Sequence, residues 1–93
     1  MWPKFRRIVL VDSAYRHGFG GHHVREVLQH RPLILRSRRG VKDSYEVFGQ
    51  TYGGEYLHIV GRVIEAEELK TFRVYHVGQM HDRDRRRYLR WRG

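Results

Sequence analysis

The chain has 93 residues, the length of one small domain with a single modest core. Hydrophobic residues make up 40% of it and aromatic residues 13%, a content that excludes a disordered chain. Cysteine is absent, which excludes disulfides, cysteine-ligated zinc and thiol catalysis. Lysine and arginine number 19 against 10 acidic residues, and the net charge of +9 favours nucleic acid, an anionic membrane surface or an acidic protein as partner.

Arginine supplies most of this charge, since lysine occurs only at Lys4, Lys42 and Lys70. The planar guanidinium binds phosphate bidentately and stacks on bases, whereas the lysine ammonium is a point charge, so the composition favours phosphate recognition. The apolar run at residues 8–11 is too short for a signal peptide, and no stretch approaches the length of a membrane span. We therefore expect a cytoplasmic protein.

The first elements are short. A run of β-branched residues predicts a strand within residues 5–11, followed by a helical turn that ends at Gly18. Apolar residues at the i, i+3, i+4 spacing then predict an amphipathic helix over residues 22–30, which Pro32 closes.

Four strand-like segments follow, at residues 33–35, 44–50, 55–64 and 71–79. The sequence TYGG at 51–54 predicts a hairpin turn, because glycine takes positive φ without strain. The acidic stretch EAEEL is expected to be a solvated turn. We therefore expect one α+β domain over residues 1–93, with a short N-terminal strand and helices on one face of an antiparallel sheet of three to four strands.

The chain ends on HDRDRRRYLRWRG, in which six of thirteen residues are arginine. Acidic residues in the first turn and arginines after it give the polarity that a helix dipole favours. Asp84, Tyr88 and Trp91 would share one helical face. We therefore predict a C-terminal basic helix that docks on the sheet through this face and holds its arginines beside the last strand.

Alternation assigns the side chains of the last two strands to faces. In the strand over 55–64 one face is the core set, and the other, with Tyr56, His58 and Arg62, is a half-polar surface suited to RNA. In the last strand Arg73 and His76 are predicted to lie on opposite faces, which argues against their sharing a site.

Metal chemistry is not expected. His22 and His23 are adjacent and cannot chelate one ion as an i, i+4 pair would, and His17 and His81 lack a ligand at the usual spacing. Metal-free RNA cleavage needs a base for the 2′-hydroxyl proton, cations for the charged phosphorane, and an acid for the leaving oxygen. Histidine, tyrosine and arginine supply all three, so we expect neither metal nor other cofactor.

Three stretches, RHGFGGHHVREVL, YEVFGQTYGGEYLHIVGRV and FRVYHVGQMHDRDRRRYLRW, together resemble the BrnT-like toxins of bacterial toxin–antitoxin operons, in the RelE-like group of small ribonucleases. The matching motifs are a His-Gly before a helix, a glycine-containing hairpin, a strand arginine and a helix of the type Glu-Arg-Arg-x-Tyr. Here they lie at His17-Gly18, Gly49 and Gly53, Arg73, and residues 84–88. The similarity covers about residues 8–91.

The resemblance implies a RelE-like fold, RNA cleavage that blocks translation, and neutralisation by a cognate antitoxin, which in this family often also binds DNA. With the residue types above, it gives as candidate catalytic residues Arg73, His76, Tyr88 and His17. The candidate nucleic-acid-binding residues are Arg62, Arg83, Arg85, Arg86, Arg87 and Arg90. The chain departs from the family where Ser-Ala-Arg is replaced by His76-Val77-Gly78 and glutamate by Asp84.

Two other interpretations stay open. The basic helix can belong to a non-catalytic module that binds nucleic acid or an acidic protein, or the arginines can serve solubility alone. Solubility does not require the aromatic residues embedded in the arginine block. Cleavage of a defined RNA, as opposed to retention without shortening, separates the enzyme from the binding module.

Overall fold

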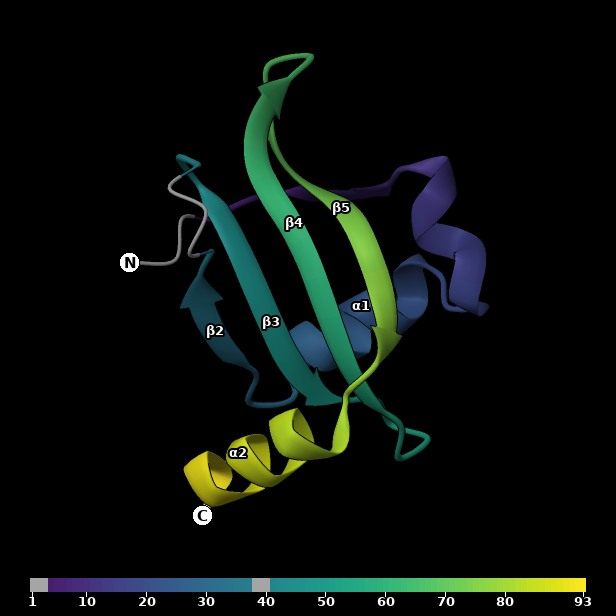
Figure 1. Cartoon of the computed structure of the whole chain (residues 1–93). Helices are drawn as coiled ribbons and strands as arrows, with labels where there is room; N and C mark the ends of the chain where they lie inside the picture. Colours follow the sequence, from purple (N-terminus) through teal and green to yellow (C-terminus); the bar gives the residue numbers. More distant parts are fainter. Residues whose placement is uncertain (1–3, 38–40) are drawn as a thin grey trace.

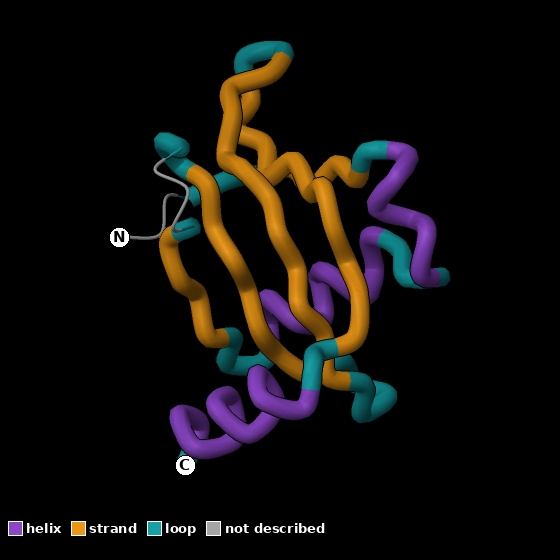
Figure 2. Tube along the Cα trace, in the orientation of Figure 1, coloured by secondary structure: helices purple, strands orange, loops and turns teal. Residues whose placement is uncertain are grey.

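Five strands form one mixed sheet in the order β1-β5-β4-β3-β2, shown in Figures 1 and 2. The computed structural model describes residues 4–37 and 41–93. The strands are β1 (Arg7–Leu10), β2 (Leu33–Arg36), β3 (Ser44–Gln50), β4 (Tyr56–Ala66) and β5 (Leu69–Gln79). The helices are the 3-10 helix η1 (Asp12–His17), α1 (Gly21–Gln29) and α2 (Asp82–Arg92).

The predicted α+β class and the order of elements are confirmed, but the sheet is larger than the expected three to four antiparallel strands. β2, β3, β4 and β5 pair antiparallel, and β1 adds a fifth strand parallel to β5, with Ile8 opposite Phe72. Two helical segments separate β1 from β2 and carry the chain from one sheet edge to the other. The N-terminal strand is therefore free to cover the β5 backbone that would otherwise be an open edge.

The core lies between α1 and one face of the sheet. Val24 and Val27 of α1 are fully buried against the inward-facing residues of the three central strands. The approach is close at Gly49, where a Cβ atom would lie 2.7 Å from Val27 Cγ1. Burial of each of these side chains contributes about 1.5–3 kcal/mol, so this face holds most of the packing energy.

The second helix lies on the other face, which corrects the expectation of helices on one face. Phe48 alternates with the core residue Val47, and the guanidinium carbon of Arg87 lies 4.8 Å above the Phe48 ring. In Figure 1, α1 runs behind the sheet and α2 crosses one end of its front.

Of the residues on the predicted docking face of α2, Tyr88 is buried as expected, whereas Trp91 is only partly covered. Tyr88 is fully buried, and its hydroxyl donates a hydrogen bond of 3.4 Å to the carbonyl oxygen of Arg31. Trp91 remains 49% exposed. Arg92 adds a hydrogen bond of 3.0 Å from Nη1 to Gln50 Oε1. The arginine-rich helix is thus fixed to the fold.

No helix within residues 4–37 and 41–93 is long and apolar enough to cross a membrane.

Candidate functional site

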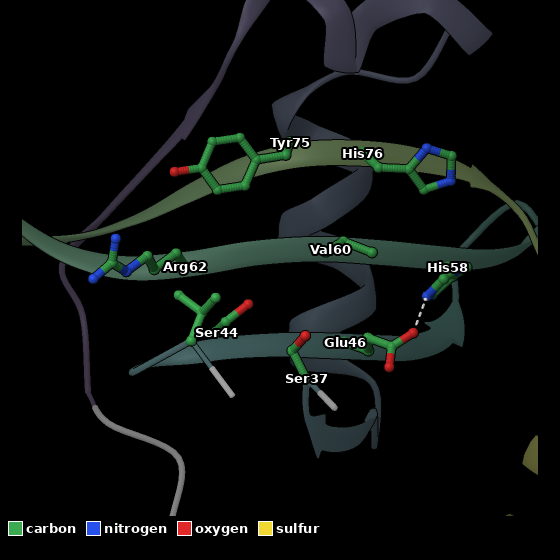
Figure 3. A pocket seen from close by; sticks show the side chains of 9 residues that line it. Ser37, Ser44, Glu46, His58, Val60, Arg62, Tyr75 and His76 are labelled. Atoms are coloured by element: carbon green, nitrogen blue, oxygen red, sulfur yellow. Dashed lines mark hydrogen bonds and ion pairs between the residues drawn. The ribbon is translucent and has the colours of Figure 1, made fainter. Parts of the chain in front are cut away.

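The front face of the sheet holds a hollow of about 660 Å³ that α2 leaves uncovered (Figure 3). Its wall comes from the three central strands and the segment after β2, so residues distant in sequence meet there. The lining residues are Ser37, Val41, Ser44, Glu46, His58, Val60, Arg62, Tyr75 and His76. Two further hollows adjoin this one. The first shares Glu46 with it, and the second shares His58 and His76 with it.

A β-bulge turns His76 toward this hollow. The register between β4 and β5 shifts at Val60/Gly61, so that His76 pairs with Val60 and Val74 pairs with Gly61. Tyr75 is the extra residue between them, and beyond it the face of each side chain is reversed relative to strict alternation. The prediction that Arg73 and His76 lie on opposite faces is therefore wrong, since their partners Arg62 and Val60 both point to the front.

A row of rings crosses the front face from α2 to η1. Phe48 lies beneath Arg87 and stacks on the His58 ring with 4.5 Å between centroids. His58 meets His76 edge-on at 5.6 Å, and His76 meets His17 at 5.4 Å. The row joins the cationic helix to three histidines that come from β4, β5 and η1.

Glu46 orients the first of these histidines. Its Oε1 lies 2.9 Å from His58 Nε2, and both side chains are less than one-third exposed. A carboxylate can only accept, so Nε2 carries the hydrogen, and Nδ1 accepts in the neutral ring or donates in the protonated ring. The pair resembles the arrangement by which a carboxylate stabilises an imidazolium.

The second histidine is harder to protonate than an ordinary one. Burial lowers the pKa of His76 below its ordinary value of 6.5, and the neighbouring His58, His17, Arg16 and His81 lower this pKa further. A neutral imidazole has a free lone pair and can accept a proton. The cluster therefore pairs a carboxylate-bound histidine with one that resists protonation.

Gly78 leaves the space in which the His76 and His17 rings meet. A Cβ atom at this position would lie 3.1 Å from His76 Nε2 and 3.4 Å from His17 Cδ2. Any side chain here would displace one of the two rings.

An arginine basin lies beside the central hollow, between α2 and the strands β2 and β3. Arg83, Arg87 and Arg90 line it together with Arg36 and share it with the acidic residues Glu46 and Asp84. Asp84 forms an ion pair of 3.6 Å with Arg87. Arg83 and Arg90 are exposed and line the basin, so their charges are accessible to an anion there.

The other predicted residues are dispersed. His17 and His76 share a hollow, and Arg62 lines the central one, whereas Arg73 lies over the Tyr75 ring at 5.9 Å. Arg85 pairs with Asp82 and faces Tyr56, on a different side of α2 from the basin, and Arg86 is exposed. Tyr88 is buried beneath α2 and lines none of the three hollows.

Glu46 and Tyr75 were not among the residues predicted for the site, and His58 was predicted only to lie on a half-polar face. The signal for Glu46 was the hairpin at residues 51–54, whose register puts Phe48 opposite His58 and makes Glu46 its diagonal neighbour. Tyr75 carries no such signal, because the bulge that exposes it is a tertiary feature.

Within residues 4–37 and 41–93, no group of three or more His, Asp or Glu side chains is placed to hold a metal ion. Comparisons with protein-family models, curated proteins and solved structures found no match for the chain. Fold and site together define a small α+β domain with a five-stranded mixed sheet, whose free face carries a histidine cluster beside a docked arginine helix.

Proposed function

We propose that this protein is a metal-independent endoribonuclease, the toxin of a bacterial toxin–antitoxin pair of the BrnT-like, RelE-like kind. The observation that carries the proposal is the meeting of His58 and His76 in one hollow that adjoins the arginine basin. General acid–base catalysis of RNA cleavage needs two proton-transfer groups of near-neutral pKa next to cations. The substrate supplies its own nucleophile, the 2′-hydroxyl.

His76 acts as the base in this proposal and His58 as the acid. Neutral His76 takes the proton from the 2′-oxygen, which attacks phosphorus, and the bond from phosphorus to the 5′-oxygen breaks. His58, protonated and hydrogen bonded to Glu46, gives its proton to that departing oxygen. The products are a 2′,3′-cyclic phosphate and a 5′-hydroxyl, so atoms and protons balance.

The arginines hold the substrate and offset charge at phosphorus. Arg62 lines the hollow of the two histidines, and its Nε donates a 3.1 Å hydrogen bond to the carbonyl oxygen of Lys42, which fixes its position. The basin arginines Arg83, Arg87 and Arg90 receive neighbouring phosphates. Arg73 orients Tyr75, His17 packs against the base, and Tyr88 anchors the helix.

The experiment is cleavage of a defined RNA by the purified protein in EDTA, which silences contaminating metal-dependent nucleases. We expect cyclic-phosphate ends, no cleavage of a matched strand with 2′-deoxyribose, and a loss of about 10²–10⁴-fold in rate for His76→Ala and for His58→Ala. His22→Ala on the opposite helix is the matched control. Full activity in either of the first two variants would remove that residue from the mechanism.

The non-catalytic binding module is the second candidate, and one observation favours it. Arg87 is paired with Asp84 and stacked on Phe48, so part of the cationic charge already has partners within the fold. RNA that is retained without being shortened, with unchanged ends after long incubation, would decide for this candidate.

A toxin in the cytoplasm requires a cognate antitoxin. The surface that an antitoxin would have to cover is the arginine basin with the adjoining histidines, and an acidic or amphipathic segment complements its charge. An adjacent reading frame that encodes a small DNA-binding protein, and suppression of toxicity when both are expressed, would support the pairing.

A further inference from the structure

We propose that Tyr75 forms a stacking subsite for one base of single-stranded RNA, in the half of the central hollow that faces away from the arginine basin. The identity of the ligand rests on the proposed function, to which the subsite adds a place for the base. Tyr75 and Arg62 border this half in Figure 3, whereas His58, His76 and Glu46 gather in the other half.

The exposure of Tyr75 is built into the strand. As the extra residue of the bulge it is 43% exposed, although Val74 before it and Val77 after it are completely buried. Packing of the core therefore does not need this ring. A half-exposed aromatic ring on a concave, basic surface is the platform that nucleobases use for stacking.

Two arginines flank this ring. The guanidinium carbon of Arg73 lies 5.9 Å from the ring centroid, a cation–π contact that restricts the ring and occupies one side of it. Arg62 shares the hollow with Tyr75 and is tied to the Lys42 carbonyl. A base on the tyrosine would therefore lie between positive charges that hold the phosphates on either side of it.

The remaining walls suit a planar base with a polar edge. Val41 and Val60 offer apolar surface for its faces, and the hydroxyl of Ser44 offers a donor and an acceptor for its edge. The volume of about 660 Å³ falls within the range of about 300–1,000 Å³ typical of small-molecule sites.

The bulge also fixes where the base lies relative to the phosphate. Tyr75 and His76 are neighbours in sequence, yet both line the same hollow, which strict alternation would forbid. A base on Tyr75 and a phosphate beside His76 therefore belong to the same nucleotide or to adjacent ones. Tyr75 would therefore bind the base of a nucleotide that adjoins the scissile phosphate.

The test measures binding separately from cleavage. A short single-stranded RNA with 2′-O-methyl groups throughout lacks the nucleophile, so its dissociation constant can be measured by fluorescence anisotropy without turnover. The proteins are the wild type, Tyr75→Ala, Tyr75→Phe and the control Tyr52→Ala, which removes an exposed tyrosine whose hydroxyl binds Gln29 of α1 on the opposite face. Each is measured also with strands that carry one abasic residue at successive positions.

We expect Tyr75→Ala to weaken binding about tenfold, the effect of one lost base stack, while Tyr75→Phe and Tyr52→Ala stay within about twofold of wild type. When the abasic residue takes the place of the base that stacks on Tyr75, the affinity of the wild type should fall by the same factor. The affinity of Tyr75→Ala should not fall further on that strand. The subsite would be overturned if Tyr75→Ala bound every strand, intact or abasic, more weakly than the wild type by the same factor. It would also be overturned if Tyr75→Ala bound RNA as tightly as the wild type, the result expected if Tyr75 binds a protein partner.

Two further outcomes keep the proposals distinct. If Tyr75→Ala is unfolded by circular dichroism, Tyr75→Leu provides the same comparison, because it keeps apolar bulk and removes the aromatic face. If the wild type binds in the base-dependent manner but never cleaves unmodified RNA, the subsite is supported and the ribonuclease proposal is contradicted.

Discussion

Replacing Tyr88 by alanine is expected to release α2 from the sheet without unfolding the sheet. Tyr88 is 0% exposed and packs between the rings of Tyr56 and Trp91, at 6.3 Å and 6.0 Å. Truncation of a buried aromatic side chain costs about 3–5 kcal/mol. The other attachments of α2 include two hydrogen bonds of Arg92, with Gln50 and His30. They also include the cation–π contacts of Arg87 with Phe48 and of Arg85 with Tyr56, and each of the four is worth about 0.5–1 kcal/mol. The loss of about 3–5 kcal/mol is therefore as large as the sum of these contacts or larger, so the helix should be released.

Tyr88→Phe separates anchoring from chemistry. It keeps the buried ring and removes only the hydrogen bond to the Arg31 carbonyl, which at 3.4 Å is long and contributes about 0.5 kcal/mol. This variant should keep α2 docked and, under the proposed function, should bind and cleave RNA at the rate of the wild type. A catalytic role of the phenol, as the sequence analysis expects, requires the opposite, namely lost cleavage with an intact helix.

Amide hydrogen exchange is the assay for the docking of α2. In Tyr88→Ala the amides of residues 85–92 should exchange close to their intrinsic rates, while those of β4 stay protected, because a terminal element opens locally at its own free energy. Protection of the α2 amides in Tyr88→Ala equal to that in the wild type would refute the reasoning, since it would mean that other contacts carry the helix.

Three further predictions concern the bulge, the histidine and the basin. Gly61→Ala should lower the free energy of unfolding in urea by about 1–3 kcal/mol, because a Cβ atom there would lie 2.6 Å from Phe72 Cε1 and 2.8 Å from the Arg73 carbonyl; Gly21→Ala, in ordinary contact with Leu10, should not. The lowered pKa of His76 means that the unfolded chain binds more protons, so stability should fall as pH drops below 6.5, and thermal unfolding of His76→Gln should depend less on pH. Arg83→Ala or Arg90→Ala should reduce the slope of log binding constant against log salt concentration for RNA by about 0.7 per lost phosphate contact. Arg25→Ala, on α1, should leave this slope unchanged. Equal slopes for all three variants would mean that the phosphates bind elsewhere.

The helices and strands of this fold were predictable where the spacing of apolar residues or a turn-forming residue determines them. Helical spacing gave α1, alternation gave the core face of β4, and Gly18 ended η1 with a φ of 84°. The fifth strand was not predictable as a sheet member, because four residues of β1 carry no information about which edge they join. The turn between β4 and β5 was also shorter than the acidic stretch indicated, since Glu67 and Glu68 both take positive φ.

The candidate site was less predictable than the fold, and the reason is one residue. Tyr75 has no partner on β4, and this single insertion turns His76 to the front face and joins it to His58. Period-2 reasoning assigns faces correctly up to such a bulge and incorrectly after it. Gly61 was a signal of close approach at the bulge, but an isolated glycine in a strand does not say which neighbour is displaced.

The electrostatics of the front face connect the proposed binding and the proposed chemistry. His76 is kept neutral partly because its neighbours His58, His17, Arg16 and His81 are cationic or become so on protonation. A phosphate that enters the hollow offsets this positive field and raises the pKa of His76. In the proposed mechanism the ring therefore enters the reaction unprotonated, and it becomes more able to hold a proton once the substrate phosphate lies beside it. Under this proposal the positive charge that would attract RNA also lowers the pKa of the proposed base, and it does so without a change in the backbone.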